Sequence, residues 1–179
     1  MKVTGIVGSP RKDGSTSELV SAVLAGAESN GAETQTFNLN ELDITPCQSC
    51  YYCKENGKCK YEDDYVEIVK ALDESDVFVI GSPVYFGEVT AQLKHFIDRL
   101  YSVVNNQGIN NTKLVLVHVQ ANPDASLYEG YIEHQKNMLY GYCGFDIVDS
   151  IQAYGIPEKE DLSTNKTFLE KAKEIGSNL

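Results

Sequence analysis

The sequence predicts an α/β fold built on a doubly wound, five-stranded parallel sheet with helices on both faces. Short, continuously apolar runs alternate along the chain with segments of helical periodicity, a pattern typical of parallel strands that are covered on both sides. Loops rich in Gly, Ser and Pro follow the first and third of these runs. We therefore expect the flavodoxin-like strand order 2-1-3-4-5, in which those two strands are neighbours at the topological switch point.

The first part of the chain predicts a strand, a helix and an edge strand. Residues 3–7 are a short apolar run that stops at a turn beginning with Gly8. Ser15 and Glu18 have the spacing of a capping box, and apolar residues recur every fourth position after them, so we expect a helix that begins there. Residues 33–40 alternate weakly between apolar and polar side chains, as an edge strand does.

The middle of the chain predicts two helices around a buried strand. Asp64 begins a second possible capping box, and the apolar residues after it share one helical face. Residues 77–80 are a continuous apolar strand, and from about Thr90 the apolar residues have the spacing of a core-facing helix. At the end of that helix we expect the adjacent Asp98 and Arg99 to form an ion pair.

The last part of the chain continues the alternation. The pattern indicates strands over residues 114–119 and 146–153, a helix over residues 128–142, and a closing amphipathic helix over residues 165–175. Because no linker and no internal repeat interrupts this order, we expect residues 1–179 to form a single domain.

Composition excludes several functional classes. The net charge of −11 argues against nucleic acid and anionic membranes as partners. The apolar runs are far too short to cross a bilayer, and the N-terminal residues lack the apolar stretch of a signal peptide, so we expect a cytoplasmic protein with no membrane contact. No Ser-His-Asp or paired-carboxylate set is evident, which disfavours hydrolysis, and we single out no catalytic side chain.

A cysteine-rich loop is predicted at about residues 46–60. It holds four of the five cysteines, at spacings of two, two and five residues: Cys47, Cys50, Cys53 and Cys59. The ferredoxin run C-x2-C-x2-C-x3-C-P begins with the same spacings and closes sooner. Four thiolates from one compact loop suit a [4Fe–4S] cluster, which is the favoured interpretation. The remaining Cys143 is most simply a small buried hydrophobic residue.

Two other chemistries stay open for these four cysteines. Structural zinc sites also use four thiolates, although they usually split them into two C-x2-C pairs separated by a longer spacer. Cysteines two residues apart can also be redox-active thiols. A disulfide framework would require an oxidising compartment, which nothing in the sequence indicates.

The loop after the first strand is suited to an anion. Its hydroxyl and basic side chains precede the start of a helix, where unpaired N–H groups and the helix dipole favour negative charge. The loop has neither a Walker sequence nor G-x-G-x-x-G, so it favours the phosphate of flavin mononucleotide (FMN) over nucleotide hydrolysis or an ordinary dinucleotide site. A well-capped helix start is the equally weighted alternative for this loop alone. The candidate phosphate ligands are Ser9, Arg11, Ser15, Thr16 and Ser17.

The loop after the third strand is the second half of the candidate flavin site. In the expected strand order it lies beside the first loop, at the edge of the sheet where ligands bind. Its backbone amides can bond the polar edge of a flavin, and its aromatic side chains can pack on the ring. The candidate residues are Pro83, Val84, Tyr85, Phe86 and Gly87.

These motifs together resemble a known family. Gly8-Ser-Pro-Arg-Lys12, Gly81-Ser-Pro-Val-Tyr-Phe86, Gln92-Leu-Lys94 and Phe96-Ile-Asp-Arg99, with the four cysteines between them, look like the iron–sulfur flavoprotein family, within the NADPH-dependent FMN reductase-like proteins. The resemblance spans about residues 1–99. It implies FMN, a [4Fe–4S] cluster, and a homodimer or homotetramer that takes electrons from ferredoxin and passes them to small acceptors such as oxygen or peroxide.

We therefore expect an oxidoreductase that moves electrons from a low-potential donor through the cluster to FMN. The cysteine loop follows the second strand, so it begins at the same edge of the sheet as the flavin loops, and we expect the cluster there. The alternatives are an NAD(P)H-dependent FMN or quinone reductase with incidental cysteines, a flavodoxin-type electron carrier without a substrate, and, more remotely, a zinc scaffold. Residues 120–124 stand where many relatives carry a glycine pair, so we assign them no nicotinamide site.

Overall fold

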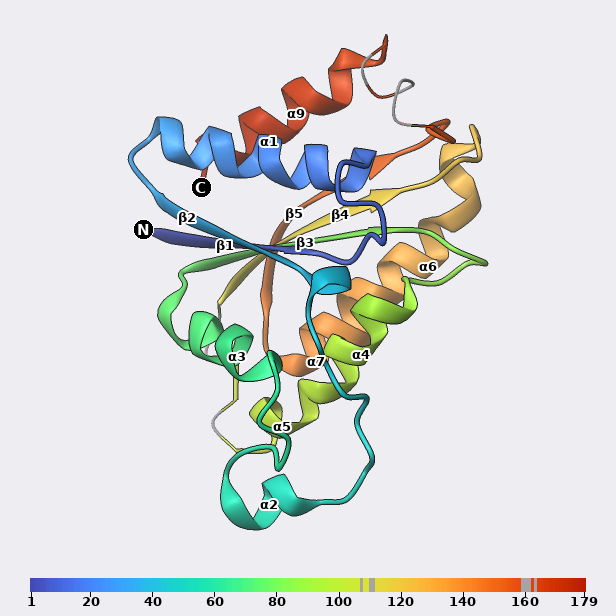
Figure 1. The fold of residues 1–179 in the computed structure, drawn as a ribbon. Coiled ribbons are helices and arrows are strands. Elements are labelled where there is room, and N and C mark those ends of the chain that lie inside the picture. The colour runs from blue at the N-terminus through green and yellow to red at the C-terminus, as the bar shows by residue number, and fades with distance from the viewer. Residues whose placement is uncertain (107, 110–111, 159–161, 163) are drawn as a thin grey trace.

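The computed structural model describes residues 1–106, 108–109, 112–158, 162 and 164–179. Its centre is a sheet of five parallel strands in the order β2-β1-β3-β4-β5, which confirms the predicted fold class and strand order (Figure 1). The strands are β1 (Lys2–Val7), β2 (Glu33–Asn38), β3 (Val77–Pro83), β4 (Lys113–Val119) and β5 (Asp146–Ala153).

Helices cover both faces of this sheet (Figure 1). One face carries α1 (Ser15–Ser29) and α9 (Lys166–Ser177). The other carries α3 (Tyr65–Glu74), α4 (Ala91–Arg99), α5 (Tyr101–Val104), α6 (Glu129–His134) and α7 (Gly141–Cys143). The short α2 (Tyr52–Asn56) lies inside the cysteine-rich loop, which follows the 3-10 turn η1 (Leu39–Glu41).

The helix predicted over residues 128–142 is present but irregular. It begins with the 3-10 turn η2 (Ala125–Tyr128), continues as α6, widens into the π-helical η3 (Gln135–Tyr140) and ends with α7. The predicted extent is close to the observed one, and the π-helical stretch, with its i→i+5 hydrogen bonds, is a feature that the sequence pattern did not predict.

The apolar strands are buried on both faces because each strand contributes side chains to two hydrophobic cores, one on each face of the sheet. In β4, Leu114 and Leu116 face the layer of α3, α4 and α7, and Val115 and Val117 face α1 and α9. Successive side chains of a strand point to opposite faces, so an all-apolar run is what two helical layers require. The carboxyl ends of the strands then emerge together at one edge of the sheet (Figure 1).

Both predicted capping boxes are wrong in detail. The helix α1 does begin at Ser15, but Gly14 occupies the cap position, and the carbonyl of Gly14 accepts the N–H of Glu18 at 3.1 Å without any side-chain cap. Asp64 does precede α3, yet its carboxylate accepts the N–H of Asp43 at 2.7 Å instead of capping the helix. The predicted helix starts are correct, and the side chains expected to cap them do not do so.

Two glycines allow α1 and α9 to pack backbone against backbone. A Cβ placed on Gly176 would lie 1.8 Å from the carbonyl oxygen of Val23, and one placed on Gly26 would lie 2.1 Å from the carbonyl oxygen of Lys173. Backbone atoms cannot withdraw as a flexible side chain can, so a methyl group at either position must push the helices apart.

We expect Gly176→Ala to lower the free energy of unfolding by about 3 kcal/mol, the upper part of the usual range for overpacking. Gly130→Ala is the matched control, since Gly130 also lies in a helix but a Cβ added to it would meet no atom within 4 Å. That substitution should stabilise the protein by up to about 1 kcal/mol through helix propensity. Urea denaturation of both variants measures the difference, and equal stabilities would contradict the close packing of α1 on α9.

Candidate functional site

Most of the candidate FMN residues surround one cavity at the carboxyl edge of the sheet. The cavity has a volume of about 170 Å³ and receives residues from the loops after β1, β3, β4 and β5. The predicted residues among its lining are Ser9, Arg11, Ser15, Thr16, Pro83, Val84 and Tyr85. Ser17, Phe86 and Gly87 are not part of this lining in the described structure. The topology thus brings together two loops that lie about seventy residues apart in the sequence.

The loop after β1 is held in place by β3, by the cap of α4 and by a hydrogen bond within the loop. Gly8 donates its N–H to the carbonyl of Gly81 at 2.8 Å, and its carbonyl accepts the hydroxyl of Thr90, the cap of α4, at 2.5 Å. Ser9 accepts the N–H of Arg11 at 3.1 Å. A Cβ on Gly8 would lie 2.8 Å from the Cβ of Leu93, so only glycine fits this crossing. The start of α1, with its free N–H groups, therefore faces a rigid turn, an arrangement that suits an anion.

Arg11 has a partner that the sequence did not reveal. Its guanidinium lies 3.3 Å from the carboxylate of Glu158, which also lines the cavity, and both side chains are well exposed. A phosphate that enters the cavity must compete with this carboxylate for Arg11. The two residues are 147 positions apart, and no motif marks Glu158, so only the folded structure could identify it.

The loop after β3 ends in a tight turn that projects an aromatic ring into solvent. Tyr85 and Glu88 exchange both backbone hydrogen bonds, at 2.8 and 3.1 Å, around Phe86 and Gly87, which have φ values of 52° and 81°. Two successive left-handed residues are the signature of a type I′ turn. Phe86 is fully exposed and Tyr85 is exposed on the same loop. These rings are available to cover a flat ligand, although Phe86 adopts an uncommon backbone conformation for a bulky residue in order to do so.

The loop after β4 is braced by a buried amide. The side chain of Gln120 donates to the carbonyls of Asn122 at 3.0 Å and Asp124 at 2.8 Å, and accepts from Gln152 at 2.9 Å. In place of the glycine pair discussed above, residues 120–124 of this chain form a loop that is folded around the side chain of Gln120. Of this loop, Ala121 reaches the candidate FMN cavity.

The cysteine-rich loop leaves the edge at which it begins. After β2 and η1 the chain runs along α4 and reaches α2, which lies below α5 (Figure 1). The flavin loops are at the start of α4, and α2 lies beyond its other end. The expectation that the cysteines lie near the flavin loops of the same chain is therefore wrong. The end of β2 fixes where the loop starts, whereas contacts with α4 and α5 decide where its cysteines lie.

All four cysteines of that loop line one small cavity, together with Tyr51, Tyr101 and Arg99. Its volume is about 30 Å³, close to the share of one water molecule in the liquid. Among the described residues, no group of three or more Cys, His, Asp or Glu side chains already has the geometry of a metal site. The donor set fits an iron–sulfur cluster in number and chemistry, and the loop must open for the thiolates to surround one.

The backbone around the second cysteine is unusual. Ser49 and Tyr51, on either side of Cys50, have φ values of 50° and 58°, in the left-handed region that residues other than glycine seldom adopt. Cys47 and Cys50 are exposed, Cys59 is partly buried and Cys53 is buried. Backbone conformations of this kind cluster at binding sites, where the surrounding structure imposes them. Cys143 is half-buried against the core and has a thiol pKa that burial raises.

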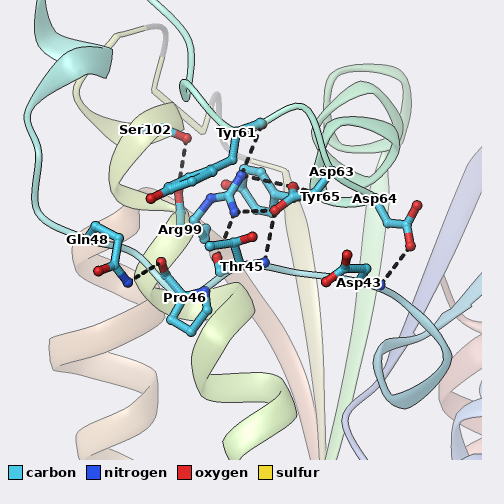
Figure 2. Close-up of polar contacts among 10 residues, drawn as sticks. All are labelled: Asp43, Thr45, Pro46, Gln48, Tyr61, Asp63, Asp64, Tyr65, Arg99 and Ser102. Carbon is cyan, nitrogen blue, oxygen red and sulfur yellow. Dashed lines mark hydrogen bonds and ion pairs between the residues drawn. The ribbon is translucent and has the colours of Figure 1, made fainter.

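Arg99 joins both ends of the cysteine loop to α4 (Figure 2). Its Nη1 donates to the carbonyl of Thr45 at 2.7 Å and to Asp63 Oδ2 at 2.8 Å, and its Nη2 donates to Asp63 Oδ1 at 3.1 Å and to the carbonyl of Tyr61 at 3.5 Å. The ring of Tyr65 lies 4.4 Å from the guanidinium carbon. The predicted pair between Asp98 and Arg99 is wrong: neighbours on a helix point in different directions, and Asp98 binds Lys94 one turn away.

The charges of Arg99 and Asp63 stabilise each other inside the protein. Burial is the strongest single influence and disfavours the carboxylate of Asp63, but the hydrogen bonds from Arg99 and from the N–H groups of Thr45 and Tyr65, together with the charge of Arg99, outweigh it and hold the pKa of Asp63 below its usual range. Burial likewise opposes the charge of Arg99, while the hydrogen bond to Asp63 and the nearby charge of Cys59 raise the pKa of Arg99. A fixed positive charge therefore stands beside the thiols.

The buried His118 does not join either site. Its ring faces Tyr131 at 6.3 Å between centroids, and burial, reinforced by Lys136, lowers the pKa of His118 to about 4. A neutral imidazole buried in the core indicates a structural role for His118.

Comparisons with known proteins give the family. The model of the family described as NADPH-dependent FMN reductase matches residues 1–155. An iron–sulfur flavoprotein of Methanocaldococcus jannaschii is 48% identical over 99 residues, which cover 55% of this chain and 51% of that protein. An iron–sulfur flavoprotein of Archaeoglobus fulgidus is 41% identical over 100 residues, 56% of this chain and 46% of that protein. The match thus spans about half the length of these curated relatives.

Solved structures agree on the fold. An NAD(P)H:quinone oxidoreductase from Methanothermobacter marburgensis superposes with a TM-score of 0.76 at 18% identity, covering 99% of this chain and 96% of that one. Within the described residues, no helix is long and apolar enough to span a membrane. With a family model that matches most of its length, this chain belongs to the NADPH-dependent FMN reductase family, and within it is similar to the iron–sulfur flavoproteins.

Proposed function

We propose that this flavoprotein oxidoreductase uses FMN and a [4Fe–4S] cluster to move electrons from a low-potential donor, such as ferredoxin, to a small acceptor. The observation that carries the proposal is the presence of two distinct cavities in one chain. One is lined by hydroxyl and basic side chains at the start of α1, and the other by four cysteines. When bound, the cluster would exchange single electrons and FMN one or two, which couples a one-electron donor to a two-electron acceptor.

In this proposal the chain binds FMN at the carboxyl edge of the sheet. Arg11 and the hydroxyls of Ser15 and Thr16, which line the cavity, would hold the phosphate over the first turn of α1. Pro83 has no N–H, and the N–H groups of Val84 and Tyr85 are bonded to the carbonyls of Val119 and Glu88. Phe86 and Gly87 would therefore offer their N–H groups to the polar edge of the ring, and the side chains of Tyr85 and Phe86 would pack beside it. The cavity is suited to a single phosphate, which favours FMN over FAD.

Cys47, Cys50, Cys53 and Cys59 would hold the cluster. The exposure of Cys47 and Cys50 leaves that side of the loop open to a docking donor and to oxygen. Arg99 and Asp63 would keep the two ends of the loop fixed while the segment between them opens.

The two cavities lie at opposite ends of α4. Thr90 at its start contacts the loop after β1, and Arg99 at its end contacts the cysteine loop. Nine helical residues span roughly 13 Å. The proposal therefore includes a homodimer or homotetramer in which the cysteine loop of one chain approaches the flavin site of a neighbour.

An NAD(P)H-dependent FMN or quinone reductase is the second candidate, because the chain belongs to the family described as NADPH-dependent FMN reductase. The loop at residues 120–124 argues against it. That loop is folded around Gln120 and lacks the glycines that would let a nicotinamide approach the flavin closely. A flavodoxin-type carrier would share both cofactors and differ in having no small-molecule acceptor.

Replacing Arg11 with Ala should weaken FMN binding by about 1.5–3 kcal/mol, the scale of a hydrogen bond to a charged group. Glu158→Gln should tighten it, because a carboxylate no longer competes with the phosphate for Arg11. Isothermal titration with FMN measures both effects, and riboflavin, which lacks the phosphate, should show neither. Lys12→Ala is the control for charge, since Lys12 pairs with Glu41 at 2.6 Å and does not line the cavity in the described structure. Equal FMN affinities of wild type and Arg11→Ala would refute the phosphate site.

Anaerobically purified protein should contain four iron atoms and four acid-labile sulfides per chain. Changing any of Cys47, Cys50, Cys53 or Cys59 to Ala should abolish the broad visible absorption of the cluster, since each supplies one of four ligands. Cys143→Ala should leave both the iron content and the spectrum intact. Stoichiometric zinc without sulfide in anaerobic material would overturn the assignment.

Reduced ferredoxin should reduce the bound flavin faster than NADPH does. Cys59→Ala protein that retains FMN should lose reduction by ferredoxin and keep chemical reduction by dithionite, because only the first route needs the thiolates. Stopped-flow absorbance on the intact oligomer measures these rates. If NADPH is the faster reductant and Cys59→Ala changes nothing, the reductase candidate is correct. If flavin is reduced but quinone, peroxide and oxygen give no turnover, the protein is a carrier.

A further inference from the structure

Among the residues that the structure describes, Arg99 has one hydrogen-bond donor without a partner. A guanidinium carries five N–H groups, two on each Nη and one on Nε. In this chain the four Nη hydrogens are matched by four contacts, to Thr45, Tyr61 and both oxygens of Asp63. Nε is fully buried and has no hydrogen-bond partner within the described residues. A buried donor of a charged group that lacks an acceptor is costly, and such groups call for an explanation.

The surroundings of Arg99 supply that explanation. The side chain is 1% exposed and lines the same small cavity as the four cysteines. Figure 2 shows the guanidinium among the oxygens of Thr45, Tyr61 and Asp63 that its Nη atoms bind. Besides side-chain oxygens such as those of Tyr101 and Ser102, the acceptors that line this cavity are the sulfur atoms of the four cysteines, to which a bound cluster would add its sulfides.

We propose that Arg99 is a positioning residue for the cluster. The Nε–H of Arg99 donates a hydrogen bond to one of the cluster's sulfur atoms, and this contact raises the reduction potential of the cluster. This inference rests on the proposed function, since it requires the cluster. It adds a role for a side chain outside the four ligands. Asp63 has the opposite effect, because its carboxylate offsets part of the guanidinium charge.

The direction of the effect follows from charge. Reduction adds one electron to the cluster, supplied by dithionite in a titration, with no bond made or broken. A positive charge and an N–H donor beside the sulfur stabilise the more negative, reduced state. Partners outside the ligand set commonly tune metal sites in this way. Arg99 thus fixes the loop through its Nη atoms and acts on the cluster through Nε.

Isotope labelling tests the contact in the unaltered protein. The chain contains only two arginines, Arg99 and Arg11, and Arg11 belongs to the loop after β1. Anaerobic holoprotein grown with ¹⁵N-arginine and reduced with dithionite should show, by pulsed electron paramagnetic resonance, a ¹⁵N coupling to the cluster spin. The coupling should vanish in Arg99→Lys. A cluster-containing wild type without ¹⁵N coupling would overturn the inference and leave the proposed function standing, whereas wild type without any cluster would overturn both.

Redox titration tests the consequence. Arg99→Lys keeps the charge and loses the Nε donor, so the reduction potential of the cluster should fall. We expect a tenfold change in the equilibrium constant for reduction, which is about 59 mV for one electron. Asp63→Asn keeps an acceptor and the shape but removes a negative charge, so its potential should shift upward. Lys58→Gln is the control: Lys58 adjoins Cys59 in sequence but is exposed to solvent, and its loss should leave the potential unchanged. If Arg99 and Asp63 are purely structural, Arg99→Lys and Asp63→Asn would change the cluster content or the thermal stability and leave the reduction potential of the retained cluster unaltered. That result would refute the proposal.

Discussion

The buried ion pair between Arg99 and Asp63 decides where the cysteine loop can lie. Arg99 ends α4, Asp63 precedes α3, and the guanidinium also binds the carbonyl of Thr45 at the other end of the loop. Removing one partner of such a pair typically costs about 3–5 kcal/mol, because the other is left as an uncompensated buried charge. The loop between the two anchors is thereby closed at its base, while its tip, with Cys47 and Cys50 exposed, can rearrange around a ligand.

The helix α4 connects the two candidate sites mechanically. Its start holds the loop after β1, since Thr90 accepts the N–H of Leu93 and donates to the carbonyl of Gly8. Its last residue holds the cysteine loop. Apolar residues on one face of α4, among them Leu93 and Phe96, fix the helix against the sheet. A single rigid element therefore sets both sites and the separation between them within one chain.

Much of the fold could be predicted from the sequence because it depends on local pattern and on general topology. Continuous apolar runs identified the strands, and the rules for parallel sheets placed the loops at Gly8 and Gly81 side by side. Long-range polar partners could not be predicted in this way. Asp63 lies 36 residues from Arg99, and Glu158 lies 147 residues from Arg11, so neither pairing leaves a periodic signal. The course of the cysteine loop depends on the first of these pairings and was missed with it.

The central claim is that one chain holds FMN and an iron–sulfur cluster at opposite ends of α4. Crystals of anaerobically purified protein measured at the iron absorption edge test it directly. The claim predicts strong iron anomalous scattering among the sulfurs of Cys47, Cys50, Cys53 and Cys59, next to Arg99, and a flavin whose phosphate contacts Arg11. Scattering at the zinc edge alone, or a cysteine loop that contains disulfides and no iron beside a bound flavin, would contradict it.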